Sequence, residues 1–287
     1  MNEQPTEEFE YDRPDFVPVD WLLCTRGYVL DGDVPARFMD DEMLNSSEPW
    51  ERLIAMTVRA KAGDFRPMGG ALDVAIQSPD WHVRDTALRL FVQAAPKADL
   101  PRLATLFDHP DEELRMEAWG MVPLACDLSL ARPLAAQRRH CSVEERTRIT
   151  VPLSNLLGDE VDELLFLETD ASDAVFEAKI RNTVDSITFG HGDVTAIYNG
   201  QPLDVFVTAS KIRSLCQDED ALECGGSMSD AMDILEAMTG LASDGCFDEE
   251  CTPDLSRILD VLNQLRSEPR FGGFVTGERY FFGKRVS

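Results

Sequence analysis

Basic residues are scarce in this sequence. Its 287 residues include 27 Lys and Arg against 53 Asp and Glu, which gives a formal net charge of −26 at pH 7. Binding to nucleic acid or to an anionic membrane requires clustered basic residues that neutralise phosphates, so we expect neither as a direct partner. The charge fits a basic protein as the partner, although solubility or adaptation to salt would account for it as well.

Long apolar runs are also lacking. No stretch approaches the roughly 18 to 20 apolar residues that a membrane-spanning helix needs. The first residues, MNEQPTEEFEYDRPDF, are acidic, whereas a secretory signal begins with basic residues and continues with apolar ones. The seven cysteines are an odd number and lie scattered, which is typical of reduced thiols. These features predict a cytoplasmic protein, and 44% apolar residues suffice for a packed core.

Patterns typical of catalytic sites are missing as well. None of the four histidines belongs to an HExxH or comparable motif. His82 and His109 fall at the starts of predicted helices, where a capping or solvent-exposed role is expected. His191, between two glycines in a predicted exposed turn, has more scope for a functional role. Because no set of titratable residues has catalytic spacing, we predict that the protein is not an enzyme and uses no cofactor.

Four cysteines in the C-terminal third could supply the ligands of a zinc site. They lack the paired CxxC spacing of such sites, and neighbouring carboxylates would raise the pKa of each thiol. The acids from Asp244 to Asp254 lack the spacing of an EF-hand calcium loop. We therefore predict no metal site, with zinc as the open alternative. The four cysteines are Cys216, Cys224, Cys246 and Cys251.

A repeat is the clearest pattern in the sequence. The segment from Ser78 to Ala87, SPDWHVRDTA, recurs 31 residues later as HPDEELRMEA from His109 to Ala118, with Pro, Asp, an aliphatic residue, Arg and Ala in register. Pro suits the first turn of a helix, and Asp there meets the positive end of the helix dipole. A looser copy begins at Pro49. Such a period, with two helices per unit, predicts a stacked helical solenoid.

The pattern P-D-x-x-[VL]-R-x-x-A resembles HEAT and HEAT-like repeats over about residues 48–140. We therefore predict a mostly α fold of HEAT-like stacked helical hairpins, with a small β element near residues 194–203 and at the C-terminus. Residues 1–18 form an acidic flexible arm in this interpretation, and 19–188 form the repeat region. Residues 189–287 form a C-terminal helical region with an acidic loop and a tail rich in Gly and aromatic residues. The pattern predicts no structure for residues 19–47.

The acidic residues are unevenly distributed. From Ser214 to Ser256 there are twelve acids and no Lys or Arg, and from Ile149 to Ala178 there are eight acids and again no Lys or Arg. A chain that needed only solubility would intersperse basic residues to reduce self-repulsion, so we predict that these acids bind a cationic partner. Solvated acidic loops are the alternative. The predicted residues are Asp218, Glu219, Asp220, Glu223, Asp248, Glu249 and Glu250, with Asp159, Glu160, Asp162 and Glu163 as a second group.

A strongly acidic HEAT-like chain without a catalytic constellation resembles, in general character, the immunity proteins of bacterial polymorphic toxin systems. The resemblance implies an inhibitor that covers the active cleft of a basic toxin, such as a nuclease, with an acidic surface. The alternative is a HEAT-like adaptor or scaffold whose partner is not a toxin. A HEAT-like enzyme that acts on DNA fits less well, because it would need a basic concave face. The sequence identifies neither the partner nor the oligomeric state.

Overall fold

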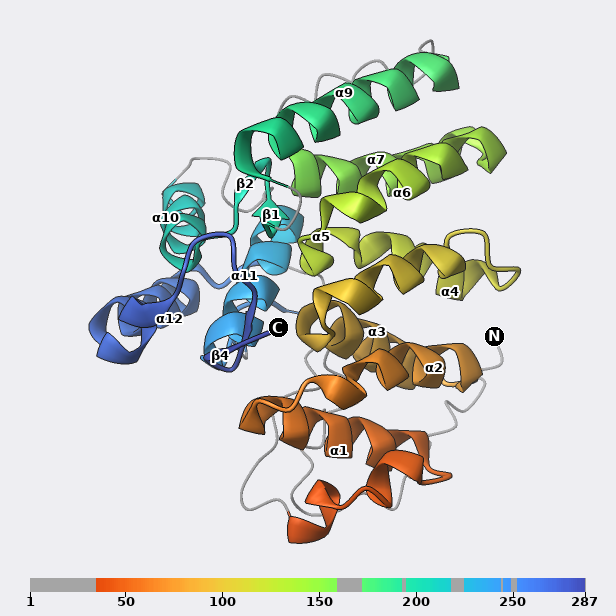
Figure 1. The fold of residues 1–287 in the computed structure, drawn as a ribbon. Helices are drawn as coiled ribbons and strands as arrows, with labels where there is room; N and C mark the ends of the chain where they lie inside the picture. The colour runs from red at the N-terminus through yellow and green to blue at the C-terminus, as the bar shows by residue number, and fades with distance from the viewer. Residues whose placement is uncertain are drawn as a thin grey trace, which may run out of the picture.

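The computed structural model describes residues 35–158, 172–192, 195–217, 225–243, 245–248 and 252–286. Over these residues the chain is mostly helical, as predicted, with two small antiparallel hairpins of strands (Figure 1). The α-helices are α1 (Pro49–Ala62), α2 (Gly69–Gln77), α3 (Trp81–Ala94), α4 (Glu112–Gly120), α5 (Val122–Ala125), α6 (Ala131–Gln137), α7 (Val143–Leu157), α9 (Asp173–His191), α10 (Val205–Leu215), α11 (Gly225–Thr239) and α12 (Leu255–Ser267).

Helices α1 to α9 follow one another in successive layers (Figure 1). Helices α1, α3, α4 and α7 contact one another in that order, α2 packs on α1 and α3, and α6 contacts both α7 and α9. Between α3 and α4 the chain forms a 3-10 helix, η4 (Lys97–Leu106), which contains Pro101. Pro101 has no backbone N–H to donate, and an irregular 3-10 helix tolerates the missing hydrogen bond.

The repeated Asp residues cap helices rather than lie inside them. The sequence pattern predicts Ser78 as the cap of a helix starting at Pro79, and this prediction is wrong. Helix α3 begins at Trp81, and Asp80 Oδ1 accepts the N–H of His82 at 2.8 Å. Asp111 caps α4 in the same way, through the N–H of Leu114. A carboxylate at this position satisfies free N–H groups of the first turn, so the repeat encodes the cap.

The repeated Arg residues connect one helix to the cap of the next. Arg84 Nε donates to the Ser78 carbonyl at 2.7 Å, and Arg84 Nη2 lies 2.8 Å from Asp111 Oδ2. Arg115 donates to the carbonyl two residues before its own cap at 2.9 Å, and its Nη2 lies 3.7 Å from Glu145 Oε1. Glu145 belongs to a capping box with Ser142 at the start of α7. The repeat therefore fixes both the helix starts and their stacking.

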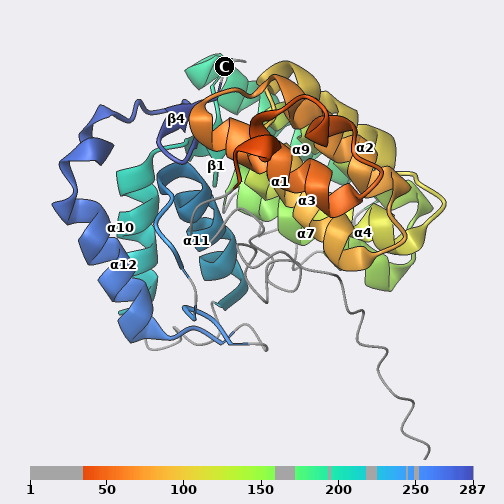
Figure 2. The ribbon, with the colours of Figure 1, turned by 90° about the horizontal axis from the view of Figure 1, so that it is seen from below.

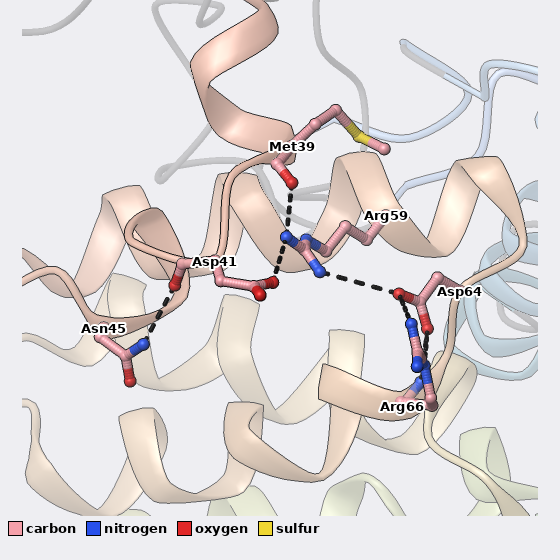
Figure 3. A network of polar contacts seen from close by, with 6 residues as sticks. All are labelled: Met39, Asp41, Asn45, Arg59, Asp64 and Arg66. Carbon is pink, nitrogen blue, oxygen red and sulfur yellow. Dashed lines mark hydrogen bonds and ion pairs between the residues drawn. The ribbon is translucent and has the colours of Figure 1, made fainter.

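The first described residues are held on α1 by Arg59 (Figure 3). These residues form two short 3-10 helices, η1 (Ala36–Met39) and η2 (Met43–Asn45). The Arg59 guanidinium is largely buried, and its Nη2 donates to the Met39 carbonyl and, at 2.7 Å, to Asp41 Oδ1. Its Nη1 lies 3.7 Å from Asp64 Oδ2 just beyond α1. A single cation on α1 therefore connects three parts of the chain.

Helix α9 is longer than the sequence pattern suggests. The predicted helix from Asp173 to Ile187 continues to His191, so this histidine is the last residue of a helix and does not lie in a turn. Its side chain is exposed. The helix ends at Gly192, whose φ of 86° favours glycine. Gly190 is tolerated inside the last turn, where the sequence pattern predicts a break.

The predicted β elements form two separate hairpins. Strands β1 (Ile197–Tyr198) and β2 (Gln201–Pro202) pair around a tight turn, and β3 (Tyr280–Phe281) pairs with β4 (Lys284–Arg285). The hairpins do not share a sheet. Backbone hydrogen bonds nevertheless join the flanking segments, because Gly277 accepts the N–H of Ala196 at 2.8 Å and donates to the Leu203 carbonyl at 2.7 Å.

The C-terminal helices lie together against one side of the layers. Helix α10 contacts both α11 and α12, and the three are grouped to one side of α1 to α9 (Figure 2). Arg279, near the C-terminus, is buried and donates to the carbonyls of Val92 and Ala95 at the end of α3. A continuous cluster of buried apolar side chains extends from Phe38 to Val286. The C-terminal helices therefore share a core with the layers.

The turn between β1 and β2 generates a stability prediction. Gly200 has φ of 71°, and a Cβ there would lie 2.5 Å from the carbonyl oxygen of Leu157. We expect Gly200→Ala to lower the free energy of unfolding by about 2 kcal/mol or more, because both the backbone and the contact would be strained. Urea denaturation measures this change. Gly120→Ala on α4 is the control, since a Cβ there would meet nothing within 4 Å, and it should be neutral or stabilising by up to about 1 kcal/mol. If Gly200→Ala and Gly120→Ala changed the free energy of unfolding equally, the requirement for glycine at position 200 would be contradicted.

Candidate partner-binding surface

Most of the predicted acidic surface lies outside the described residues. Asp248 is the exception, and it is exposed. Its carboxylate accepts the N–H of Thr252 at 2.8 Å, so it closes its own loop. The remaining predicted residues, which stay a prediction, are Asp218, Glu219, Asp220, Glu223, Glu249, Glu250, Asp159, Glu160, Asp162 and Glu163.

Three acids of the same stretch serve the fold. Asp230, Asp233 and Glu236 lie three residues apart on α11, which places them along one face of that helix. Asp230 Oδ2 accepts a hydrogen bond from Asn155 Nδ2 on α7 at 2.8 Å. Asp233 Oδ2 accepts one from Arg89 Nη1 on α3 at 2.5 Å. Binding of a cationic partner is therefore not the only use of the acids between Ser214 and Ser256. Those on α11 take their hydrogen-bond partners from other helices of the same chain.

Arg89 is the central cation of this contact. Its guanidinium lies between Asp85, at 2.9 Å, and Asp233, at 2.5 Å, and both carboxylates are largely buried. Burial raises the pKa of Asp85, and Arg89 opposes that shift. Removing one partner of a buried ion pair leaves an uncompensated charge, which typically costs several kcal/mol. Loss of Arg89 would therefore leave two largely buried carboxylates without their cation where α3 meets α11.

Asp230 forms no ion pair within the described ranges. Part of the residue reaches solvent, but its carboxyl lies deep among protein atoms. Its pKa is raised to about 7, mainly by burial and also by the neighbouring Asp233, while Arg89 and the Asn155 hydrogen bond oppose the shift. The nearby Tyr198 phenol also has a raised pKa, mainly through burial. Near neutral pH this region therefore carries a carboxyl that binds and releases a proton.

Glu236, the third acid of the face, lies close to α1. It is 2% exposed and accepts a hydrogen bond from the Ser243 hydroxyl. Lys61 on α1 has its pKa lowered to about 8 by burial, while Glu236 acts in the opposite direction. The Lys61 Nζ also lies 4.1 Å from the centroid of the Phe282 ring. Helix α11 therefore faces Lys61 on α1, Arg89 and Gln93 on α3, and Asn155 on α7.

A cavity of about 140 Å³ adjoins Asn155, between the end of α7, the β1–β2 hairpin, α10 and α11. Polar groups of Asn199, Asp204, Thr208 and Lys211 line it together with apolar side chains. Asp204 is already used, because its carboxylate caps α10 and accepts a hydrogen bond from the Thr276 hydroxyl. The cavity has room for a small polar molecule or a few waters.

A second hollow, of about 530 Å³, lies open on the surface at the start of α3 and along α4 and α7. We call it the Trp81 groove and define it by its lining residues. Trp81 is 50% exposed, and its ring lies 3.8 Å from that of His82. The groove was not predicted from the sequence. Its lining residues are Trp81, Glu113, Met116, Glu117 and Arg148.

Glu117 gives the groove its electrostatic character. Its pKa is raised to about 7, mainly by burial and also by Asp85, Glu113 and Asp111, while Arg84 opposes the shift. Its Oε2 atom is buried and has no hydrogen-bond partner among the described residues. The groove therefore presents two carboxyl groups, those of Glu113 and Glu117, beside the guanidinium of Arg148.

His109 lies at the start of a helix, and Cys126 and Cys216 are thiols with raised pKa values. His109 Nδ1 accepts the N–H of Asp111 at 3.2 Å, which is the helix-start role expected for it. Burial raises the pKa of the Cys126 thiol to about 12 and also raises that of Cys216. Cys224 and Cys251, of the zinc alternative, lie outside the described residues. Among those described, no three His, Cys, Asp or Glu side chains are grouped as metal ligands would be.

Comparison with known proteins adds no assignment. No protein family, no characterised protein and no solved structure matches this sequence. In the described ranges, no helix combines the length and the apolar character that crossing a membrane would require.

The buried carboxyl of Asp230 predicts a pH-dependent stability. Its folded-state pKa of about 7 lies above that of an unfolded Asp, about 3.9. Between these values the unfolded chain releases a proton that the folded chain keeps, so stability falls as the pH rises from about 4 to about 7. Asp230→Asn removes this dependence while keeping an acceptor for Asn155. We expect it to raise the free energy of unfolding at pH 8 by roughly 1–3 kcal/mol, and to change it little at pH 4.

Chemical denaturation at the two pH values measures this difference. Asp260→Asn is the control, because Asp260 is exposed on α12 and the same charge is lost there. Equal destabilisation by Asp230→Asn at both pH values would contradict this account, because the effect would then not depend on the ionisation of Asp230.

Proposed function

We propose that this protein is a non-enzymatic inhibitor that binds a basic protein, and specifically an immunity protein that neutralises a basic bacterial toxin in the cytoplasm. The observation that carries the proposal is the unbalanced negative charge, which is −26 overall and includes the carboxylates of the Trp81 groove. A nuclease is a natural target, because its active cleft must be basic to hold nucleic acid. Carboxylates arranged against such a cleft both accelerate association and block the substrate.

The proposed scaffold is a HEAT-like solenoid. Its support is the 31-residue repeat, in which equivalent Asp residues cap α3 and α4 and equivalent Arg residues pair with the cap of the following helix. A stack of this kind presents one extended face built from successive helices, which suits the recognition of a large protein surface. The Trp81 groove lies across three of these helices, α3, α4 and α7.

Inhibition rather than scaffolding is the preferred function because the unbalanced carboxylates match a basic active cleft. An adaptor would use the same face to hold a partner whose activity continues. The two functions share the binding surface and differ in what happens to the partner. A single experiment can therefore separate them.

The test begins with the identification of the partner. The tagged protein is crosslinked in its own cells, and the captured protein is identified by mass spectrometry and then purified. We expect a basic protein whose activity is lost at one equivalent of inhibitor, with an association rate that falls steeply as salt increases. A bound partner that keeps its activity would support the adaptor instead. A neutral or acidic partner with salt-independent association would contradict the role of charge.

Charge reversal tests the predicted acidic segment in the same assay. Changing Asp218, Glu219 and Asp220 to Lys should slow association and weaken its salt dependence, with each close pair contributing from under 1 to a few kcal/mol. The control reverses three exposed acids elsewhere in the chain by the same total charge. An unchanged rate over a range of salt would exclude this segment from the interface. The control residues are Asp40, Asp108 and Asp260.

A further inference from the structure

We propose that the Trp81 groove is a subsite for an arginine side chain of the protein partner. This inference rests on the proposed function and deepens it, because it names the group that the acidic face recognises. The groove combines three features that a guanidinium uses. These are the exposed ring of Trp81, the carboxyl groups of Glu113 and Glu117 on the neighbouring helix α4, and an open hollow of about 530 Å³.

The positions of the groove residues follow from the stacking of the helices. Trp81 is the first residue of α3, and the Asp80 cap fixes the start of that helix. Glu113 and Glu117 lie four residues apart on α4, so they are neighbours on one face of that helix. Met116 lies beside them and contributes an apolar, polarisable surface. The aromatic ring and the two carboxylates therefore border the same hollow although they come from different helices.

The charges near the groove favour a cation from outside. Arg84 pairs with Asp111 and donates to the carbonyl of Ser78. Arg148 lies at the groove wall, where its Nη1 is 2.6 Å from the sulfur of Met116 rather than from a carboxylate. Glu117 keeps a buried oxygen that no described residue reaches with a hydrogen bond. That oxygen is closed to solvent, so an incoming guanidinium would face the Glu113 and Glu117 carboxyl groups at the surface of the groove and bring a second positive charge beside Arg148.

Arginine fits the groove better than lysine does. A guanidinium is planar, so it can stack on the face of Trp81 while its edge donates to a carboxylate. It is also less strongly hydrated than an ammonium group, which lowers the cost of entering a partly buried site. The hollow is larger than one side chain and leaves room for the partner's backbone around the arginine.

The subsite can be tested on the full chain without the natural partner. The probe is the peptide Gly-Gly-Arg-Gly-Gly with blocked ends, compared with the same peptide carrying lysine or citrulline. Citrulline has the shape of arginine without its charge. Binding at low salt is followed by NMR through the indole N–H of Trp81, which gives both the position and the Kd. We expect the arginine peptide to shift this signal, the lysine peptide to bind more weakly, and the citrulline peptide to bind weakest.

Substitutions then assign the contacts. Glu117→Gln should weaken binding of the arginine peptide by about tenfold, as expected for loss of a charge-assisted hydrogen bond. Trp81→Leu should weaken it by about two- to fivefold through loss of the cation–π contact. Asp260→Asn, with the same loss of charge on α12, should leave the Kd within a factor of about two. Circular dichroism confirms the fold of each variant, and Trp81→Phe, which keeps an aromatic ring, replaces any leucine variant that does not fold.

The outcomes separate the subsite from the proposed function. Equal binding of the arginine peptide by the native protein, Glu117→Gln and Asp260→Asn would overturn the subsite, and it would leave a basic partner bound elsewhere unaffected. Equal binding of arginine and citrulline peptides would also overturn it. If the groove binds arginine as expected but the partner captured from cells is neutral or acidic, the subsite stands and the proposed inhibitor does not.

Discussion

The contact between Arg89 and its two carboxylates connects the two parts of this molecule. Arg89 on α3 and Asp233 on α11 are 144 positions apart in the sequence, and the same guanidinium also binds Asp85 on its own helix. The chain has about twice as many acids as bases, and here one buried cation is shared by two carboxylates. Without it, both carboxylates would remain largely buried beside each other at the contact between α3 and α11.

The shortage of cations leaves some carboxylates without a counter-charge in the described part of the chain. Asp230, on the same face of α11 as Asp233, has a pKa raised to about 7, and so does Glu117 on α4, whose pKa Asp85 also raises. The two have different surroundings. Asp230 is held by Asn155 inside the protein, whereas Glu117 borders an open groove. One unbalanced carboxyl therefore belongs to the fold, and the other is accessible to a cation from outside.

Much of the helical structure could be predicted from the sequence because its signals are local. Pro49 opens α1, and the S-x-x-E pattern of Ser142 and Glu145 is typical of the capping box that begins α7. The start of α3 is less certain from the sequence by two residues, since both Ser78 and Asp80 are good caps and only the backbone geometry decides between them. The end of α9 lies later than the glycines suggest, because Gly190 is accommodated inside the last turn.

The polar sites could not be predicted in the same way, because they depend on contacts between distant segments. The sequence shows that Asp230, Asp233 and Glu236 lie on one helix face, but not that this face points toward the protein's own Asn155, Arg89 and Lys61. A partial signal existed for the Trp81 groove. Trp81 and Glu112 occupy equivalent positions of the repeat. A large aromatic residue in a position that is charged in the next repeat indicates an exposed site, and only the stacking of α3 on α4 places Glu117 beside it.

The most direct measurement is the titration of individual Asp and Glu carboxyl groups by NMR, with and without an arginine peptide. Asp230 and Glu117 should both titrate at about pH 7, well above the remaining exposed acids. The peptide should lower the titration midpoint of Glu117, because a bound cation stabilises its charged form, and it should leave Asp230 unchanged. Titration of both carboxyls near their ordinary pKa of about 4, with neither affected by the peptide, would contradict both the buried charge balance and the cation site.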